Sequence, residues 1–118
     1  MPHQSDLPLL RDKLREFAAA RDWDQFYSPK NLSMALMVEV AELMEHFQWL
    51  TEEQSGKLPA DKMAEVSEEL ADILLYLVRL SDKLGVDLRA AALDKLEKNA
   101  KKYPADKVRG SSKKYSEY

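Results

Sequence analysis

Two pairs of acidic residues with the same spacing are the strongest chemical feature of the sequence. In each pair the second residue follows the first by three positions, and the pairs are Glu39 with Glu42 and Glu69 with Asp72. On a helix, residues so spaced lie on one face, with Cβ atoms about 5–6 Å apart, where their charges repel. Two antiparallel helices would bring the pairs together across one groove. Four carboxylates there predict a site for Mg²⁺, with Mn²⁺ as a second choice.

The neighbours of Glu39 strengthen this prediction. On a helical wheel Glu39 falls at the margin of a narrow apolar stripe, whose members are Leu32, Leu36, Val40, Leu43, Phe47 and Leu50. A half-buried glutamate costs several kcal/mol (about 2–5) unless a cation or hydrogen-bond donors meet it. We therefore expect Glu39 to face a cation.

Other polar residues near the pairs have simpler explanations. Glu45, Glu65 and Glu68 are interpreted as solvated surface charges. The Glu-x-x-His pairs of di-iron helical bundles are absent, because His46 follows Glu42 by four positions and Glu45 by one. His46 is interpreted as a surface or interface residue, and di-iron chemistry is disfavoured.

The pairs need helices to position them, and the sequence predicts four. Asp6, Ser28 and Asp87 are expected N-caps, Pro29 suits a first turn, and Gly85 suits a helix end. The predicted helices cover about 7–22, 29–50, 61–84 and 88–103, and the remaining residues, 105–118, form an irregular basic tail. No alternating strand pattern occurs in the sequence. The predicted fold is an all-α four-helix bundle, with residues 1–118 as a single domain.

Composition excludes several classes of function. The chain has 118 residues, a net charge of −3 and no cysteine, so disulfides, cysteine-bound zinc and thiol catalysis are excluded. Its three glycines are isolated, which excludes a glycine-rich phosphate loop. The net charge argues against a nucleic-acid partner, and no apolar run is long enough to predict a membrane partner. The absence of cysteine suits a cytoplasmic location.

The acidic pairs and the segments around them resemble one known family. Glu39-Val-Ala-Glu42 and Glu69-Leu-Ala-Asp72 are similar to the signature of MazG-like all-α nucleoside triphosphate pyrophosphohydrolases, and the dCTP pyrophosphatase branch is the most similar. The segments that extend the resemblance over about residues 7–118 are RDWDQFYSPKNL, FQWL, EELADILLYLV and KNAKKYP. The resemblance implies Mg²⁺-dependent hydrolysis of a triphosphate to a monophosphate and pyrophosphate, in nucleotide-pool sanitation. It implies metal ligands and catalytic carboxylates at Glu39, Glu42, Glu69 and Asp72, and Glu45 as a catalytic addition that orients a second metal or the water.

The resemblance also implies a nucleotide-binding set. Aromatic residues would hold the base and sugar, and the candidates are Trp23, Tyr27, Trp49 and Tyr76. Polar residues are candidates for holding phosphates. Lys30 and Asn31 lie at a predicted helix N-terminus, which favours anions, and Lys95, Asn99 and Lys102 form a polar strip on an apolar helix face. The resemblance supports Asn99 and Lys102. Three tail residues would reach the phosphates of a neighbouring subunit: Arg109, Lys114 and Tyr115. The sequence departs from the branch at Tyr27 and Leu14, where histidine is common, so base selectivity is open.

Apolar residues outside the expected core predict self-association. Residues 73–80 are apolar around most of the helix, and a methionine-rich surface adds Met34, Met37, Val38 and Met44. Such surfaces favour a symmetric homo-oligomer, and the resemblance implies a homotetramer, with a homodimer as the alternative. Two other functions stay open: the same chemistry on another triphosphate, and a catalytically inactive helical interaction module.

Overall fold

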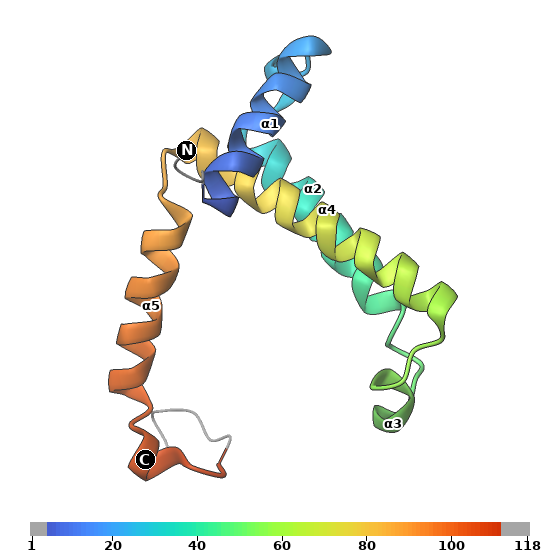
Figure 1. The fold of residues 1–118 in the computed structure, drawn as a ribbon, viewed down its shortest axis with the longest axis vertical. Coiled ribbons are helices and arrows are strands. Elements are labelled where there is room, and N and C mark those ends of the chain that lie inside the picture. The colour runs from blue at the N-terminus through green and yellow to red at the C-terminus, as the bar shows by residue number, and fades with distance from the viewer. Residues whose placement is uncertain (1–4, 112–118) are drawn as a thin grey trace. The chain divides into compact units, whose positions relative to one another are not determined.

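The computed structural model describes residues 5–111, and within this range every regular element is a helix (Figure 1). The long helices are α1 (Asp6–Ala20), α2 (Pro29–Glu45), α4 (Ala60–Leu84) and α5 (Leu88–Lys102). The short elements are a 3₁₀ helix, η1 (Asp24–Phe26), α3 (Glu52–Ser55) and α6 (Ala105–Val108). The all-α prediction is confirmed. The count of four is wrong, because α3 and α6 add four-residue α-helices in the predicted loop and tail.

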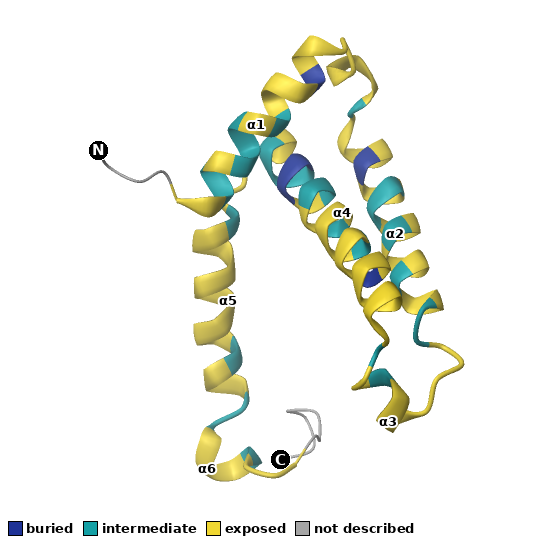
Figure 2. Ribbon diagram, turned by 45° about the vertical axis from the view of Figure 1, so that its right-hand side comes forward, coloured by how far each residue is buried: buried dark blue, intermediate teal, exposed yellow. Residues whose placement is uncertain are grey.

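The chain divides into two compact units, one ending at Val86 and the other beginning at Asp87. In the first unit α4 contacts both α1 and α2, and α2 and α4 lie side by side (Figures 1 and 2). Among the described residues, the fully covered apolar side chains are Ala18, Leu32, Val66 and Val78, spread over α1, α2 and α4. The second unit contains α5 and α6. The assignment of residues 1–118 to a single domain stays a prediction.

Helix caps form where the sequence predicts them for α2 and α5. The Ser28 hydroxyl accepts a hydrogen bond from the Asn31 N–H, and Pro29 occupies the first turn of α2. The Asp87 carboxylate accepts one from the Ala90 N–H at the start of α5. In both cases a side-chain oxygen satisfies an N–H group that the helix itself leaves without a partner.

No helix within residues 5–111 is long and apolar enough to cross a membrane.

Two predicted helix ends are wrong. The helix α1 starts at Asp6, so Ser5 and not Asp6 occupies the cap position, and no side chain caps this end. The helix α2 stops at Glu45 instead of continuing to Leu50. The chain turns over residues 46–50, and Thr51 then begins α3 with a reciprocal capping box with Gln54.

Gly85 ends α4 as predicted. Its φ of 70° lies in the left-handed region, its N–H donates to the Asp82 carbonyl, and the Val86 N–H donates to the Ser81 carbonyl. This hydrogen-bond pattern is the Schellman motif, in which a glycine avoids the steric cost that a Cβ brings at positive φ.

We expect Gly85→Ala to lower the free energy of unfolding by about 1 kcal/mol, because alanine is strained at this φ. Gly56→Ala is the matched control, since Gly56 has a φ of −86° and an added Cβ would be in ordinary contact with the Glu53 carbonyl at 3.6 Å. Chemical denaturation followed by circular dichroism measures both changes. Equal losses in the two variants would contradict a specific role for the left-handed conformation.

Candidate functional site

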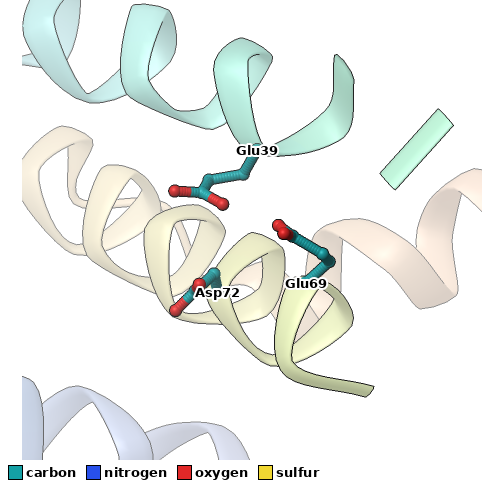
Figure 3. Close-up of side chains that lie close together, drawn as sticks. All are labelled: Glu39, Glu69 and Asp72. Carbon is teal, nitrogen blue, oxygen red and sulfur yellow. The ribbon is translucent and has the colours of Figure 1, made fainter. Parts of the chain in front are cut away.

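Three carboxylates meet between α2 and α4. Glu39 on α2 and Glu69 and Asp72 on α4 each contribute one oxygen atom, and these oxygens lie within 4.8 Å of one another. Figure 3 shows the three side chains converging from the two helices. Glu39 and Glu69 are half-buried, whereas Asp72 is exposed. The predicted convergence of the two acidic pairs is therefore present for three of their four members.

Without a bound cation, the burial and closeness of these carboxylates disfavour their charged forms. The pKa of the Glu39 carboxyl is raised to about 7, first by burial, then by its hydrogen bond with Glu69 and by the negative charges of the neighbouring carboxylates. The Oε2 atom of Glu69 is buried without a hydrogen-bond partner among the described residues. None of the ion pairs found within residues 5–111 includes Glu39, Glu69 or Asp72. The cluster therefore has the character of a cation site.

The remaining acidic candidates lie around the cluster. Glu42 is exposed on α2 and is not a member of the group of three, although its charge helps raise the pKa of Glu39. Glu45 is exposed at the last position of α2. His46 is half-buried, with its Nδ1 atom 3.8 Å from the Glu65 Oε2 atom. This contact agrees with the interpretation of His46 as a residue outside the acidic cluster.

An aromatic cavity of about 260 Å³ adjoins the cluster. Its walls come from α1, the turn before α2, α2 and α4, and the lining residues are Leu14, Phe17, Trp23, Tyr27, Leu32, Asp72, Leu75, Tyr76 and Arg79. Asp72 belongs both to this lining and to the acidic cluster. A molecule with a flat apolar part in the cavity would therefore have its other end beside the carboxylates.

Three of the four predicted aromatic residues line the cavity. The ring of Trp23 packs edge-on against Phe17 at 5.7 Å between centroids, and the Arg79 guanidinium lies 5.1 Å from the centre of the Tyr27 ring. Burial, and then the charge of Glu39, raises the pKa of the Tyr76 hydroxyl.

Trp49 does not belong to this cavity lining. It lies in the turn that follows α2 and is 86% exposed. The α2 residue that lines the cavity is Leu32, which precedes Trp49 by 17 positions, and even a continuous helix would place the two about 25 Å apart.

The predicted phosphate ligands have different positions. Lys30 is exposed in the first turn of α2, and the Asn31 side chain donates from Nδ2 to the Phe26 carbonyl at 3.1 Å. Asn31 thus ties the start of α2 to the preceding turn. The candidates on α5, in the second unit, are an exposed Lys95, a half-buried Asn99 and an exposed Lys102. Of the tail candidates, Arg109 is exposed directly after α6, while Lys114 and Tyr115 lie outside the described residues.

The sequence analysis missed Arg79, Phe17 and Leu75 as lining residues. Arg79 is buried, with a side chain that is 6% exposed, and its Nη2 atom donates to Asp24 at 2.7 Å. A single arginine in the apolar run ILLYLVRL was the available signal, because a buried charge needs a partner. Leu75 falls in the predicted apolar run 73–80, and neither Leu75 nor Phe17 carries a sequence signal that it borders a cavity.

Similarity to known proteins agrees with this geometry. Residues 34–118 match the MazG-like family. The chain is 47% identical to human dCTP pyrophosphatase 1 over 93% of this chain and 68% of that protein, and 46% identical to the Bos taurus protein over 96% and 70%. A solved pyrophosphatase structure from Archaeoglobus fulgidus is 39% identical, with a TM-score of 0.81 over 88% of this chain and 97% of that one. These relatives confirm the predicted enzyme class, a nucleotide pyrophosphohydrolase, and the chain belongs to the MazG-like family.

Proposed function

We propose that this chain hydrolyses dCTP or a modified dCTP to the monophosphate and pyrophosphate, with Mg²⁺, in nucleotide-pool sanitation. One observation carries the proposal: Asp72 lines the aromatic cavity and also belongs to the acidic cluster. A nucleotide whose base lies in the cavity would then have its phosphates next to the carboxylates. The names of the human and bovine relatives support dCTP as the substrate.

The residues of the cluster fit a divalent cation. The buried Oε2 atom of Glu69 lacks a hydrogen-bond donor among the described residues. Burial and then the neighbouring carboxylates raise the pKa of Glu39, and a positive ion would offset both effects by stabilising the charged form. Carboxylate oxygens are the ligands that Mg²⁺ prefers, and Mn²⁺ accepts the same donors. Glu39, Glu69 and Asp72 would hold the ion, with Glu42 as the fourth ligand. Bound Mg²⁺ neutralises charge on phosphate oxygens and makes a nearby water more acidic.

The aromatic residues would bind the base. The rings of Trp23, Tyr27 and Tyr76 line the cavity, and stacking on such rings contributes about 1–3 kcal/mol per base with little dependence on base identity. Base selectivity must then come from the shape and the polar groups of the cavity. The same chemistry on another deoxynucleoside or ribonucleoside triphosphate is the alternative.

The remaining candidates are proposals carried over from the family resemblance. Glu45 would orient a second metal ion or the attacking water. Phosphate oxygens would be bound by residues at the start of α2, on α5 and in the tail, namely Lys30, Asn31, Lys95, Asn99, Lys102, Arg109, Lys114 and Tyr115. Trp49, at 86% exposure, would contact a nucleotide through a second copy of the chain. The cytoplasmic location and the absence of nucleic-acid and membrane partners also stay predictions.

The proposed assembly is a homotetramer, with a homodimer as the alternative. The face of α2 outside the contact with α4 exposes large apolar side chains, Met34, Met37, Val38 and Met44, each more than half exposed. On α4, Leu70, Leu74 and Leu77 are 52%, 39% and 36% exposed. Apolar surface of this kind is stabilised when a second subunit covers it.

We expect a panel of triphosphates with Mg²⁺ to yield pyrophosphate most rapidly from dCTP or a modified dCTP. Glu69→Gln should lower this turnover by about 100-fold or more, because the ion would lose a charged ligand. Glu68→Gln is the matched control, since Glu68 is exposed on the same helix and outside the cluster. Near-normal turnover in Glu69→Gln would contradict the proposed site. Pyrophosphate from no triphosphate would favour the helical interaction module.

We expect the chain with a chelator to lose thermal stability as the pH rises from about 4.5 to about 7. The folded state raises the pKa of Glu39 from 4.5 to about 7, so protonation stabilises the folded chain, and this contribution is lost across that interval. The loss should be on the order of 1–2 kcal/mol after screening by water. Circular dichroism melting curves should show a flatter pH dependence for Glu39→Gln.

Mg²⁺ provides the complementary measurement. It should raise the melting temperature more at pH 7.5 than at pH 5, because the ligands must lose their protons to bind it. Glu68→Gln should behave like the unaltered chain in both experiments. If the melting temperature of Glu39→Gln changed with pH as steeply as that of the unaltered chain, the cluster would not be the cause of this pH dependence.

We expect light scattering coupled to size exclusion to return a mass near four times the 13.6 kDa of one chain. Met37→Glu should lower that mass, because it introduces a charge at a position that is 65% exposed on the apolar face of α2. A mass of two chains would favour the homodimer. A monomer for the unaltered chain would contradict self-association.

A further inference from the structure

A buried arginine connects two walls of the aromatic cavity. Arg79 projects from α4, is 5% exposed and lines the cavity. Its Nη2 atom donates to the Asp24 Oδ1 atom at 2.7 Å, and Asp24 belongs to the 3₁₀ helix η1, which lies in the sequence between the lining residues Trp23 and Tyr27. The two residues are 55 positions apart in the sequence, so this ion pair is a tertiary contact. Burial makes the contact important, since an arginine this covered needs a counter-charge.

A second cation of α4 binds the same carboxylate oxygen. Lys83 follows Arg79 by one helical turn, and its Nζ atom donates to the Asp24 Oδ1 atom at 2.6 Å. The hydrogen bond from Lys83, with the charges of both cations, lowers the pKa of Asp24. Asp24 is therefore a charged acceptor at neutral pH. We call Asp24, Arg79 and Lys83 the Asp24 network.

The Asp24 network holds the segment that carries two of the cavity's aromatic rings. This segment, Trp23–Tyr27, is fixed at its ends by its neighbours in sequence: the Trp23 N–H donates to the Ala18 carbonyl of α1 at 2.9 Å, and the Asn31 side chain of α2 donates to the Phe26 carbonyl at 3.1 Å. The ion pairs of Asp24 with Arg79 and Lys83 connect the segment to α4.

The same arginine also contacts one of the rings. Its guanidinium lies 5.1 Å from the centre of the Tyr27 ring, within the range of a cation–π interaction. The wall formed by Tyr76 and Arg79 on α4 is thus joined to the wall formed by Trp23 and Tyr27 by a charged contact and a ring contact. The separation of the two walls decides which flat molecule fits between them.

We propose that Asp24 is a positioning residue for base binding, and that its ion pairs with Arg79 and Lys83 set the position of the Trp23 and Tyr27 rings relative to α4. The inference rests on the proposed function for the identity of the ligand, a nucleotide base. The Asp24 network contains no member of the acidic cluster, so its loss should weaken binding and selectivity while the carboxylates stay in place. A ground-state binding role raises KM more than it lowers kcat.

The kinetic test compares Asp24→Ala and Asp24→Asn with the unaltered chain. Both variants should raise KM for the triphosphate hydrolysed fastest in the panel, by about tenfold for Asp24→Ala, and keep kcat within about twofold. They should also narrow the difference in kcat/KM between that triphosphate and the others. Asp24→Glu keeps the charge and should restore part of the KM. Asp24→Asn keeps the shape of the side chain, so the test survives if Asp24→Ala does not fold.

Arg15→Gln is the matched control. Arg15 on α1 makes an ion pair with Asp82 on α4 that does not include the Trp23–Tyr27 segment. The Asp82 Oδ2 atom also lies 3.9 Å from the Arg79 Nη1 atom, but the Arg15→Gln change leaves Asp24, Arg79 and Lys83 in place. Arg15→Gln should leave KM unchanged even where its melting temperature falls as far as that of Asp24→Ala. A KM unchanged in both Asp24 variants, or an equal rise in Arg15→Gln, would overturn the proposal and leave the ion pair as a contribution to stability alone.

A spectroscopic readout separates this inference from the proposed function. In a Trp49→Phe background, Trp23 is the remaining tryptophan, and it is 42% exposed. Asp24→Ala should increase the quenching of its fluorescence by acrylamide, and Arg15→Gln should not. Unaltered quenching in Asp24→Ala would overturn the positioning role. A wild-type chain that hydrolyses no triphosphate would contradict the proposed function, while the quenching comparison would still decide whether Asp24 holds the Trp23 ring.

Discussion

Mutual repulsion among three carboxylates is the constraint around which the first unit is organised. Glu39, Glu69 and Asp72 are brought together because α2 and α4 pack side by side, with Leu32 and Val66 among the side chains that this packing covers. Hydrophobic burial elsewhere on these helices must offset the cost of the like charges. Burial, then the hydrogen bond with Glu69 and then the neighbouring charges raise the pKa of Glu39 to about 7. A site of this kind lowers the free energy of unfolding of the metal-free chain, and the same arrangement is suited to bind a cation.

The helix α4 carries two opposite electrostatic arrangements along its length. Its first half contributes acidic residues of the cluster, and no ion pair found within residues 5–111 includes Glu39, Glu69 or Asp72. Its second half carries acidic residues that have cationic partners. Asp82 forms an ion pair with Arg15 of α1, and this contact lowers the pKa of the Asp82 carboxyl. The two arrangements meet at the cavity, which Asp72 and Arg79 both line. A nucleotide has matching polarity, since its phosphates need cations and its base needs apolar and aromatic surface.

Short-range signals in the sequence determined the long helices and several of their ends. Ser28, Gly85 and Asp87 act within three residues of themselves, through a cap or a left-handed backbone, and each was predicted correctly. The meeting of the three carboxylates could also be predicted from the sequence, because acidic residues spaced by three on each of two antiparallel helices predict a shared groove. Trp23, Tyr27 and Tyr76, which line the cavity, were predicted from the sequence as aromatic ligands of the base and sugar.

Tertiary structure alone decided which of these residues share one cavity and what holds them there. Trp49 lies outside that cavity because it follows Leu32, the α2 residue that lines the cavity, by 17 positions, which is about 25 Å at the rise of a helix. The role of Arg79 depends on Asp24, a partner 55 positions away, and no local pattern encodes a contact at that distance. Helix periodicity and capping are properties of neighbouring residues, so the sequence displays them. Ion pairs and cavity walls depend on how whole helices pack, and they exist only once the chain has folded.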